Sequence, residues 1–205
     1  CFDTTKVASV TYGNGKFVCV GDSGKASYST DGITWTVLTP GPADGICFDA
    51  TNATFVAWCF DKFIVVGGSG KASYSADGIT WTVLTAGAAS GIKFTAPAAR
   101  WVAYGNGQFV VVGDSGKASY SADGITWTVL TAGAGTGICF STTQARSVHY
   151  GAGKWLVVGA SGLASYSFDG ITWVALTPGT TTGIRFSTTQ ANCVLYCGNI
   201  WLCIG

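Results

Sequence analysis

The sequence predicts an all-β protein made of repeated four-stranded antiparallel units, and three observations lead to this prediction. A segment of the form Ser-x-Asp-Gly-x-Thr-Trp first occurs at Ser29 and returns three more times at intervals of 46 residues. Thirty glycines in 205 residues, without helical periodicity, favour short strands joined by tight turns. Each interval contains four β-rich stretches separated by turn residues. Four antiparallel strands in roughly 40 to 50 residues are typical of a β-propeller blade, which makes a β-propeller the predicted fold.

The repeat divides the chain into four complete units and a partial one. The units are 1–46, 47–92, 93–138, 139–184 and the partial 185–205. We therefore expect 1–205 to form a single β-propeller domain of five blades, the last incomplete. A solenoid of stacked rungs is the alternative, but solenoid ends need polar caps, and the sequence shows none.

Four strands are expected within each unit. In the first unit they cover 7–12, 17–21, 26–29 and 33–39. An Asn-Gly turn joins the first two strands, because these residues favour the positive φ of a tight hairpin. The second strand is apolar on both faces, as in "FVCVG" and "FVVVG". This pattern indicates a strand that neighbouring sheets cover on each side.

The repeated segment resembles the Asp-box of the BNR-repeat β-propellers, a family that includes the sialidases. It is one residue shorter than the commonest form of that motif. In that family the Asp-box is structural. The resemblance therefore implies that each Asp accepts hydrogen bonds from its own turn and that each Trp packs between blades. The residues concerned are Asp31, Trp35, Asp77, Trp81, Asp123, Trp127, Asp169 and Trp173.

The resemblance does not extend to the catalytic residues of sialidases. Those enzymes need three arginines, a Tyr-Glu pair and an acidic Asp. The chain has Arg100, Arg146 and Arg185 but contains no Glu. The single His, His149, stands in first-strand register and is expected to be a packed or rim residue. No catalytic residue, cofactor or metal site is therefore expected, and a glycoside hydrolase is the least favoured function.

Composition narrows the range of partners and locations. Charged residues make up 10% of the chain and its net charge is +1, so charge gives no reason to expect nucleic-acid binding. No apolar run is long enough to cross a bilayer, so membrane insertion is not expected. Eight cysteines, an even number, favour disulfides and an extracellular or cell-surface location. Asn52 in "NAT" is then the candidate glycosylation site.

A lectin-like module that binds a neutral glycan is the favoured function. Small, hydroxyl-rich loops on a rigid scaffold suit neutral sugars, and similar blades would offer several equivalent sites. The binding face would carry the turns between the second and third strands. The candidate ligand-binding residues are Asp22, Lys25, Lys71, Asp114 and Lys117. The recurring Phe2, Phe48, Phe94, Phe140 and Phe186 are expected to fill the core instead of stacking on a ligand.

The alternative is a structural or adhesive repeat segment of a larger extracellular assembly. Another extracellular protein would then be the partner. The incomplete fifth blade could also mediate self-association, because an unpaired strand edge invites pairing with another chain.

Overall fold

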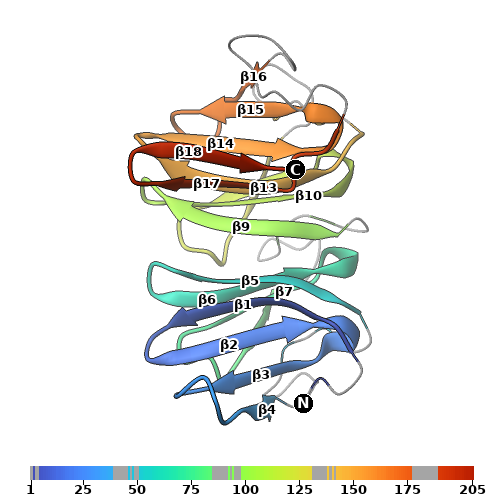
Figure 1. The fold of residues 1–205 in the computed structure, drawn as a ribbon, viewed down its shortest axis with the longest axis vertical. Coiled ribbons are helices and arrows are strands. Elements are labelled where there is room, and N and C mark those ends of the chain that lie inside the picture. The colour runs from blue at the N-terminus through green and yellow to red at the C-terminus, as the bar shows by residue number, and fades with distance from the viewer. Residues whose placement is uncertain are drawn as a thin grey trace.

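The part of the protein that the structure describes is all β apart from four short 3-10 turns. The computed structural model describes residues 2, 5–38, 46, 48, 51–84, 92, 94, 98–130, 138, 140, 142–176 and 189–205. These residues form four four-stranded antiparallel sheets and one two-stranded sheet (Figure 1). Within this described part, no helix is long and apolar enough to cross a membrane.

Each sheet follows the order of its strands along the chain. The first consists of β1 (Val7–Gly13), β2 (Lys16–Gly21), β3 (Ala26–Ser29) and β4 (Thr36–Leu38). The second consists of β5 (Ala53–Cys59), β6 (Lys62–Gly67), β7 (Ala72–Ser75) and β8 (Thr82–Leu84). The third consists of β9 (Ala99–Gly105), β10 (Gln108–Gly113), β11 (Ala118–Ser121) and β12 (Thr128–Leu130). The fourth consists of β13 (Ala145–Gly151), β14 (Lys154–Gly159), β15 (Ala164–Ser167) and β16 (Val174–Leu176), and the fifth of β17 (Cys193–Cys197) and β18 (Ile200–Ile204).

The sheets are blades arranged about a common axis. The first strands of successive sheets (β1, β5, β9, β13 and β17) pack beside one another, and each sheet runs outward from there to its last strand. In Figure 1 the first blade extends downward to β4 and the fourth extends upward to β16. The predicted β-propeller architecture is therefore confirmed, and the solenoid alternative is wrong, because its rungs would stack along a single axis.

Tight turns join the first two strands of each blade. Asn14 and Gly15 have φ angles of 44° and 73°, the left-handed pair that a two-residue hairpin turn requires. In the second blade the place of this Asn is taken by Phe60, with φ of 61°. A bulky side chain is strained in this conformation, so Phe60 is held there by its surroundings.

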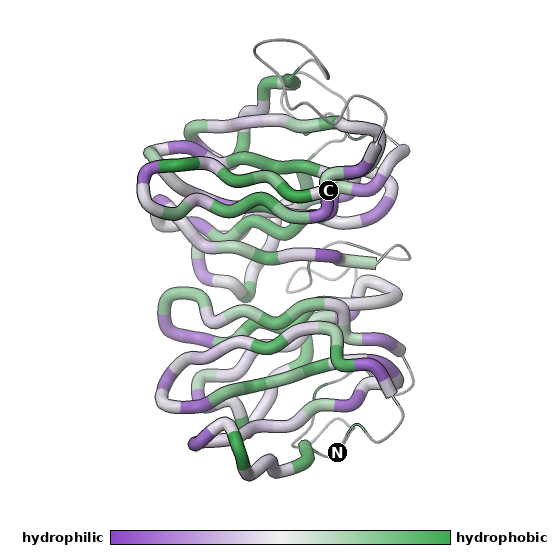
Figure 2. The backbone as a smooth tube through the Cα atoms, in the orientation of Figure 1, coloured by the Kyte–Doolittle hydropathy of each residue, from purple (hydrophilic) through white to green (hydrophobic). Residues whose placement is uncertain are grey.

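The second strands form the core, as their apolar sequence predicts. Ile64, Val65 and Val66 of β6 are fully buried, because the neighbouring blades cover both faces of the sheet. Figure 2 shows hydrophobic stretches along the strands and hydrophilic ones at the hairpin turns. The rings of Phe48 and Phe140 are also buried, each against the glycine that ends the second strand of its own blade. The same is true of Phe2 and Phe94, whereas Phe186 lies outside the described residues.

The fourth strand is shorter than the prediction of 33–39. Its first-blade example, β4, covers only Thr36–Leu38, and Thr39 lies outside the described residues. The preceding turn explains the difference, because Ile33 and Thr34 donate their backbone N–H groups to Asp31 and not to the neighbouring strand.

Each Ser-x-Asp-Gly segment closes its turn with the same set of hydrogen bonds. In the third blade the Asp123 carboxylate accepts the backbone N–H groups of Ile125 at 2.8 Å and Thr126 at 2.7 Å. The Ser121 hydroxyl donates to Asp123 at 2.9 Å and accepts the backbone N–H of Gly124, also at 2.9 Å. Equivalent bonds surround Asp31, Asp77 and Asp169. The four aspartates thus hold their own turns.

In the second, third and fourth blades, the tryptophan after the turn packs between its own blade and the one before. Trp81, Trp127 and Trp173 are only 3%, 2% and 4% exposed. Each belongs to a hydrophobic cluster that two blades share: Trp81 to that of the first and second, Trp127 to that of the second and third, and Trp173 to that of the third and fourth. Trp35 of the first blade is half-buried. These contacts join the blades into one structure.

The turn hydrogen bonds also lower the pKa of the four aspartates. Backbone N–H groups of Ile33 and Thr34 lower the pKa of the Asp31 carboxyl to about 2. At Asp77, Asp123 and Asp169, desolvation by partial burial raises the pKa. Hydrogen bonds from two backbone N–H groups and a serine together outweigh it, so the pKa lies below its ordinary value.

We predict that Asp123→Ala lowers the free energy of unfolding by about 0.5–2 kcal/mol, by analogy with loss of a helix N-cap. The variant leaves the N–H groups of Ile125 and Thr126 without their acceptor. Chemical denaturation at pH 7 measures the change. Asp61→Ala is the control, because Asp61 is exposed and its ion pair is with the adjacent Lys62. Equal stability of Asp123→Ala and wild type would contradict the structural role.

The lowered pKa values predict a loss of stability in acid. Each carboxyl has a lower pKa in the folded protein than in the unfolded chain, where it is about 3.9. Its contribution is therefore complete above about pH 4 and is lost as the pH falls through the folded pKa, about 2 for Asp31. The denaturation midpoint of the wild type should drop as the pH falls from 4 to 2. The drop should be smaller in Asp123→Asn, because this variant has one carboxyl of lowered pKa fewer. A midpoint that is constant from pH 4 to pH 2 would refute this.

Candidate functional site

The predicted lysine and aspartate residues lie at the turns between second and third strands. These turns are the 3-10 segments η1 (Asp22–Gly24), η2 (Gly68–Gly70), η3 (Asp114–Gly116) and η4 (Ala160–Gly162). Each contacts the start of a first strand; for example, the Asp22 N–H donates to the Lys6 carbonyl at 3.0 Å. Lys25 and Lys71 are half-buried, whereas Lys117 is exposed. Their role in binding stays a prediction.

One of these candidates already has a strong internal partner. The Asp114 carboxylate accepts hydrogen bonds from Nε of Arg100 at 2.8 Å and from its terminal nitrogen at 2.9 Å. This two-point ion pair joins η3 to β9 of the same blade and neutralises the Arg100 charge. The glycosylation candidate Asn52 is exposed, but its side-chain oxygen accepts the Ser23 N–H at 3.0 Å and so bridges two blades. Its glycosylation also stays a prediction.

The described cysteines do not form the disulfides that the even cysteine count favoured. Cys19, Cys59, Cys193, Cys197 and Cys203 are all free thiols, and the remaining three lie outside the described residues. Burial raises the pKa of Cys59 to about 12, and burial together with the neighbouring Cys193 raises that of Cys203 to about 11. Such thiols stay protonated and are poor nucleophiles and metal ligands.

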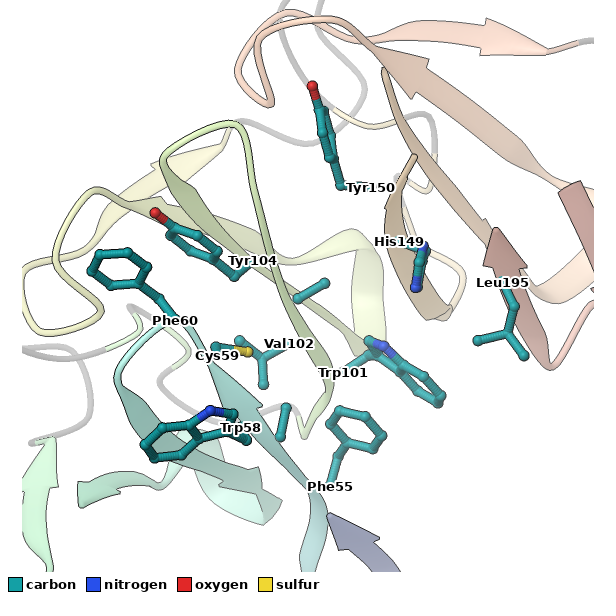
Figure 3. Close-up of a pocket in the computed structure, with 12 residues that line it drawn as sticks. Phe55, Trp58, Cys59, Phe60, Trp101, Val102, Tyr104, His149, Tyr150 and Leu195 are labelled. Atoms are coloured by element: carbon teal, nitrogen blue, oxygen red, sulfur yellow. The ribbon is translucent and has the colours of Figure 1, made fainter. Parts of the chain in front are cut away.

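An aromatic cavity lies among the first strands of four blades (Figure 3). Its volume is about 350 Å³. Phe55 and Trp101 stack with ring centroids 4.0 Å apart, and Figure 3 shows them beside one another, with His149 and Leu195 on nearby strands. The principal lining side chains are Phe55, Trp58, Phe60, Trp101, Tyr104, His149, Tyr150 and Leu195.

Phe60, the strained hairpin residue, belongs to this cavity. Its ring stacks on that of Tyr104 at a centroid distance of 5.2 Å, although the Phe60 side chain is 69% exposed. An exposed aromatic ring held in a strained backbone conformation at the mouth of a cavity is typical of a binding surface.

His149 forms part of the wall of the cavity. It is half-buried and lies edge-on to Trp201, with centroids 6.2 Å apart. Desolvation by burial lowers its pKa below the ordinary value. The ring is therefore neutral at pH 7, which keeps this end of the cavity free of positive charge.

A second, basic cavity of about 540 Å³ lies at the starts of the first strands. Lys6, Arg100 and Arg146 contribute its cationic side chains. Arg146 bonds to two neutral oxygens, those of Asn192 at 3.2 Å and Gln144 at 2.6 Å. Its buried Nε has no hydrogen-bond partner within the described part of the chain. Lys6 is exposed, so this cavity keeps a net positive charge although Arg100 is paired with Asp114.

The two cavities share a wall. Phe55 and Trp101 line both of them. We call the two cavities together the inner groove. It has an aromatic end at the hairpin turns and a basic end on the face that carries η1 to η3.

The face predicted to bind a ligand adjoins the basic end of the inner groove, whereas the groove itself was not predicted. Arg100 and Arg146 stand at one position of successive units, and the structure brings both into the basic cavity. The aromatic end carried a signal as well, because one first-strand position is aromatic in every unit. That position holds Tyr12, Trp58, Tyr104, Tyr150 and Tyr196.

No protein-family profile matches this sequence, and no curated protein sequence matches it either. Solved structures do share its fold. A chain described as "YCF48 bound to D1 peptide" superposes with a TM-score of 0.66 and 14% sequence identity, covering 96% of this chain and 59% of that one.

"YCF48 from Cyanidioschyzon merolae" superposes with a TM-score of 0.62 and 16% identity, covering 95% of this chain and 61% of that one. The chain thus spans about three fifths of the length of the structures it resembles. At these identities the similarity establishes a common β-propeller fold.

Proposed function

We propose that this chain is a non-catalytic binding module whose inner groove holds an extended polypeptide segment. The ligand would present an aromatic or apolar side chain together with a carboxylate. The observation that carries this proposal is the stacked Phe55–Trp101 pair, which lines both the aromatic and the basic cavity. A single extended ligand can therefore contact both ends of the inner groove at once.

The aromatic end would supply most of the binding energy. Aromatic residues are enriched in protein interfaces, because they bury a large apolar area at a small cost in conformational entropy. Trp101, Phe60 and Tyr104 come from two adjacent blades and are fixed by ring contacts. A surface that is ordered before binding loses less entropy when the ligand docks.

The basic end would orient the ligand. The described hydrogen-bond partners of Arg146 are uncharged, so a ligand carboxylate would supply the opposite charge that its guanidinium lacks. Arg100 is already paired with Asp114 and would contribute less. Lys6 adds an exposed positive charge at the same end.

The comparison with solved structures supports the ligand class. One structure of similar fold is described as bound to a peptide. Its sequence is only 14% identical, so the position and chemistry of the site are argued from the residues of this chain alone.

The chemistry of the groove supports binding over catalysis. The chain has no Glu. In the groove, His149 is neutral at pH 7 and Cys59 has a raised pKa. General acid–base or nucleophilic catalysis would need a group that titrates near neutral pH beside a reactive partner.

A neutral glycan in an extracellular setting is the second candidate. The exposed ring of Phe60 and the half-buried Trp101 favour it, because the apolar faces of sugar rings pack on aromatic rings. A neutral sugar would nevertheless offer no opposite charge to Arg146 and Lys6, whereas an acidic peptide would supply one. The face that carries Lys25, Lys71 and Lys117 adjoins the basic end and could contribute to either ligand.

We predict that a phage-displayed library of random peptides, selected on the immobilised chain, enriches sequences that combine an aromatic residue with Asp or Glu. Binding of a synthetic consensus peptide is then measured by calorimetry. Trp101→Ala and Arg146→Gln should each weaken it about tenfold or more. Higher salt should weaken peptide binding to wild type more than binding to Arg146→Gln. Salt screens the attraction between the Arg146 charge and the peptide carboxylate, and the variant lacks that charge.

Val129→Ala serves as the matched control, because Val129 is exposed on β12, the outermost strand of the third blade. If Trp101→Ala lowers the stability of the protein, Arg146→Gln still tests the site, because it removes a charge and leaves the aromatic rings in place. Selected peptides that bind both groove variants as tightly as wild type would rule out this site. Neutral sugars that bind on a glycan array, with no peptide enriched, would favour the second candidate.

A further inference from the structure

The two arginines of the basic cavity are the extra residues of β-bulges. In β9, Ala99 and Trp101 pair with successive residues of β10, so Arg100 between them has no partner residue on that strand. In β13 the residues on either side of Arg146 pair with β14 in the same way. A bulge turns a side chain out of the regular alternation of its strand, and bulges are frequent beside binding and active sites. The two bulges therefore explain how neighbouring blades each direct an arginine into one cavity.

One position of the repeat supplies most of the polar wall of this cavity. It holds Ala8, Thr54, Arg100, Arg146 and Asn192, which stand 46 residues apart and all line the cavity. Two successive units place arginine there, and the other three place a small or neutral side chain. The basic cavity is therefore a single site and not a set of equivalent sites on equivalent blades.

Both guanidinium groups are held in place by internal hydrogen bonds and still have donors to offer. Arginine carries five N–H donors. Arg100 bonds Asp114 through Nε and one terminal nitrogen, and these bonds do not use its other terminal nitrogen. Arg146 bonds Asn192 and Gln144 through its two terminal nitrogens, while its Nε has no partner among the described residues. Groups that are already positioned lose little conformational entropy when they bind an anion.

The charge of the cavity is larger than one carboxylate can balance. Lys6, Arg100 and Arg146 line the cavity and Asp114 pairs with one of them, which leaves a net charge of +2. A phosphomonoester carries about −1.5 to −2 at pH 7 and has three strong acceptor oxygens. Because the three cations come from three blades, a tetrahedral group can offer an oxygen to each of them, whereas a planar carboxylate has two oxygens.

We propose that the basic cavity binds a phosphomonoester group in preference to a carboxylate. Arg146 and Arg100 would donate to its oxygens, since guanidinium groups suit two-point contacts with phosphate. Lys6 would add a positive charge from the first blade. The carrier of the group, a polypeptide, rests on the proposed function. The ligand of the inner groove is then a peptide with a phosphorylated side chain, and an apolar neighbour of that side chain occupies the aromatic end.

The first test compares phenyl phosphate with benzoate, which present the same ring with a phosphomonoester or a carboxylate. Calorimetry at pH 7 and equal ionic strength should show that phenyl phosphate binds the full chain about tenfold or more tightly. Arg146→Gln should remove most of this preference, and Arg100→Gln should reduce it less, because Asp114 shares the Arg100 charge. Inorganic phosphate should bind more weakly than phenyl phosphate; equal binding would assign the cavity to free phosphate and overturn the ester as its ligand.

Lys154→Gln is the matched control for loss of one positive charge. Lys154 begins β14 and does not line the basic cavity, so this variant should keep the preference for phenyl phosphate. Equal affinity of wild type for phenyl phosphate and benzoate would overturn the proposal. An equal loss of phenyl phosphate binding in Lys154→Gln and Arg146→Gln would overturn it as well, because the effect would then come from net charge and not from the cavity.

A second test separates this proposal from the proposed function. The peptide consensus selected on the chain is synthesised with its acidic residue as Glu or as phosphoserine, and the phosphoserine form should bind about tenfold or more tightly. If the Glu form binds and phosphoserine brings no gain, the phosphate preference is wrong and the proposed function stands. If neither form binds while phenyl phosphate keeps its Arg146-dependent preference, the phosphate site is upheld and the proposed function fails.

Discussion

In the second, third and fourth blades, the tryptophan that follows the aspartate turn joins its blade to the blade before it. Trp127 packs with Ile64 and Leu84 in the hydrophobic cluster that the second and third blades share. Burying an indole removes roughly 150–250 Å² of surface from water, an upper estimate of about 4–6 kcal/mol at 25 cal/mol per Å². Because the contact lies between units and not within one, a single unit has no complete core, and the stability of each blade depends on its neighbour.

The aspartate turn fixes the position of this tryptophan. Asp123 binds the N–H groups of Ile125 and Thr126, and the indole N–H of Trp127 donates to the carbonyl of Gly124 at 3.2 Å. The repeated Ser-x-Asp-Gly-x-Thr-Trp segment thus has a structural role. The proposed ligand contacts therefore lie outside the motif, on the first strands, which pack beside one another.

Most of the scaffold could be predicted from the sequence. Glycine turns indicate the local chain direction, doubly apolar second strands indicate burial on both faces, and the 46-residue interval repeats both signals in every complete unit. The inner groove could not be predicted from the sequence in the same way. In β5 the buried residues are Ala53, Val56 and Cys59, every third residue, and the pairing with β6 shifts register between Ala53 and Phe55. Strict alternation would put Phe55 on the same face as Ala53, so no simple strand pattern reveals that it lines the groove.

The groove arises where the repetition fails. Ser69–Ala88 is identical to Ser115–Ala134, but one first-strand position reads Ser9, Phe55, Trp101, Ser147 and Cys193 along the five units. Where it is serine, the hydroxyl binds the backbone of the next first strand: Ser9 donates to the Val56 carbonyl, and Ser147 accepts the Val194 N–H. An aromatic ring cannot form this bond. Phe55 and Trp101 stack on one another instead, with a cavity on each side. Two aromatic residues in place of serine therefore give a nearly uniform scaffold one distinct surface, and this favours a single ligand over the several equivalent sites that identical blades would offer.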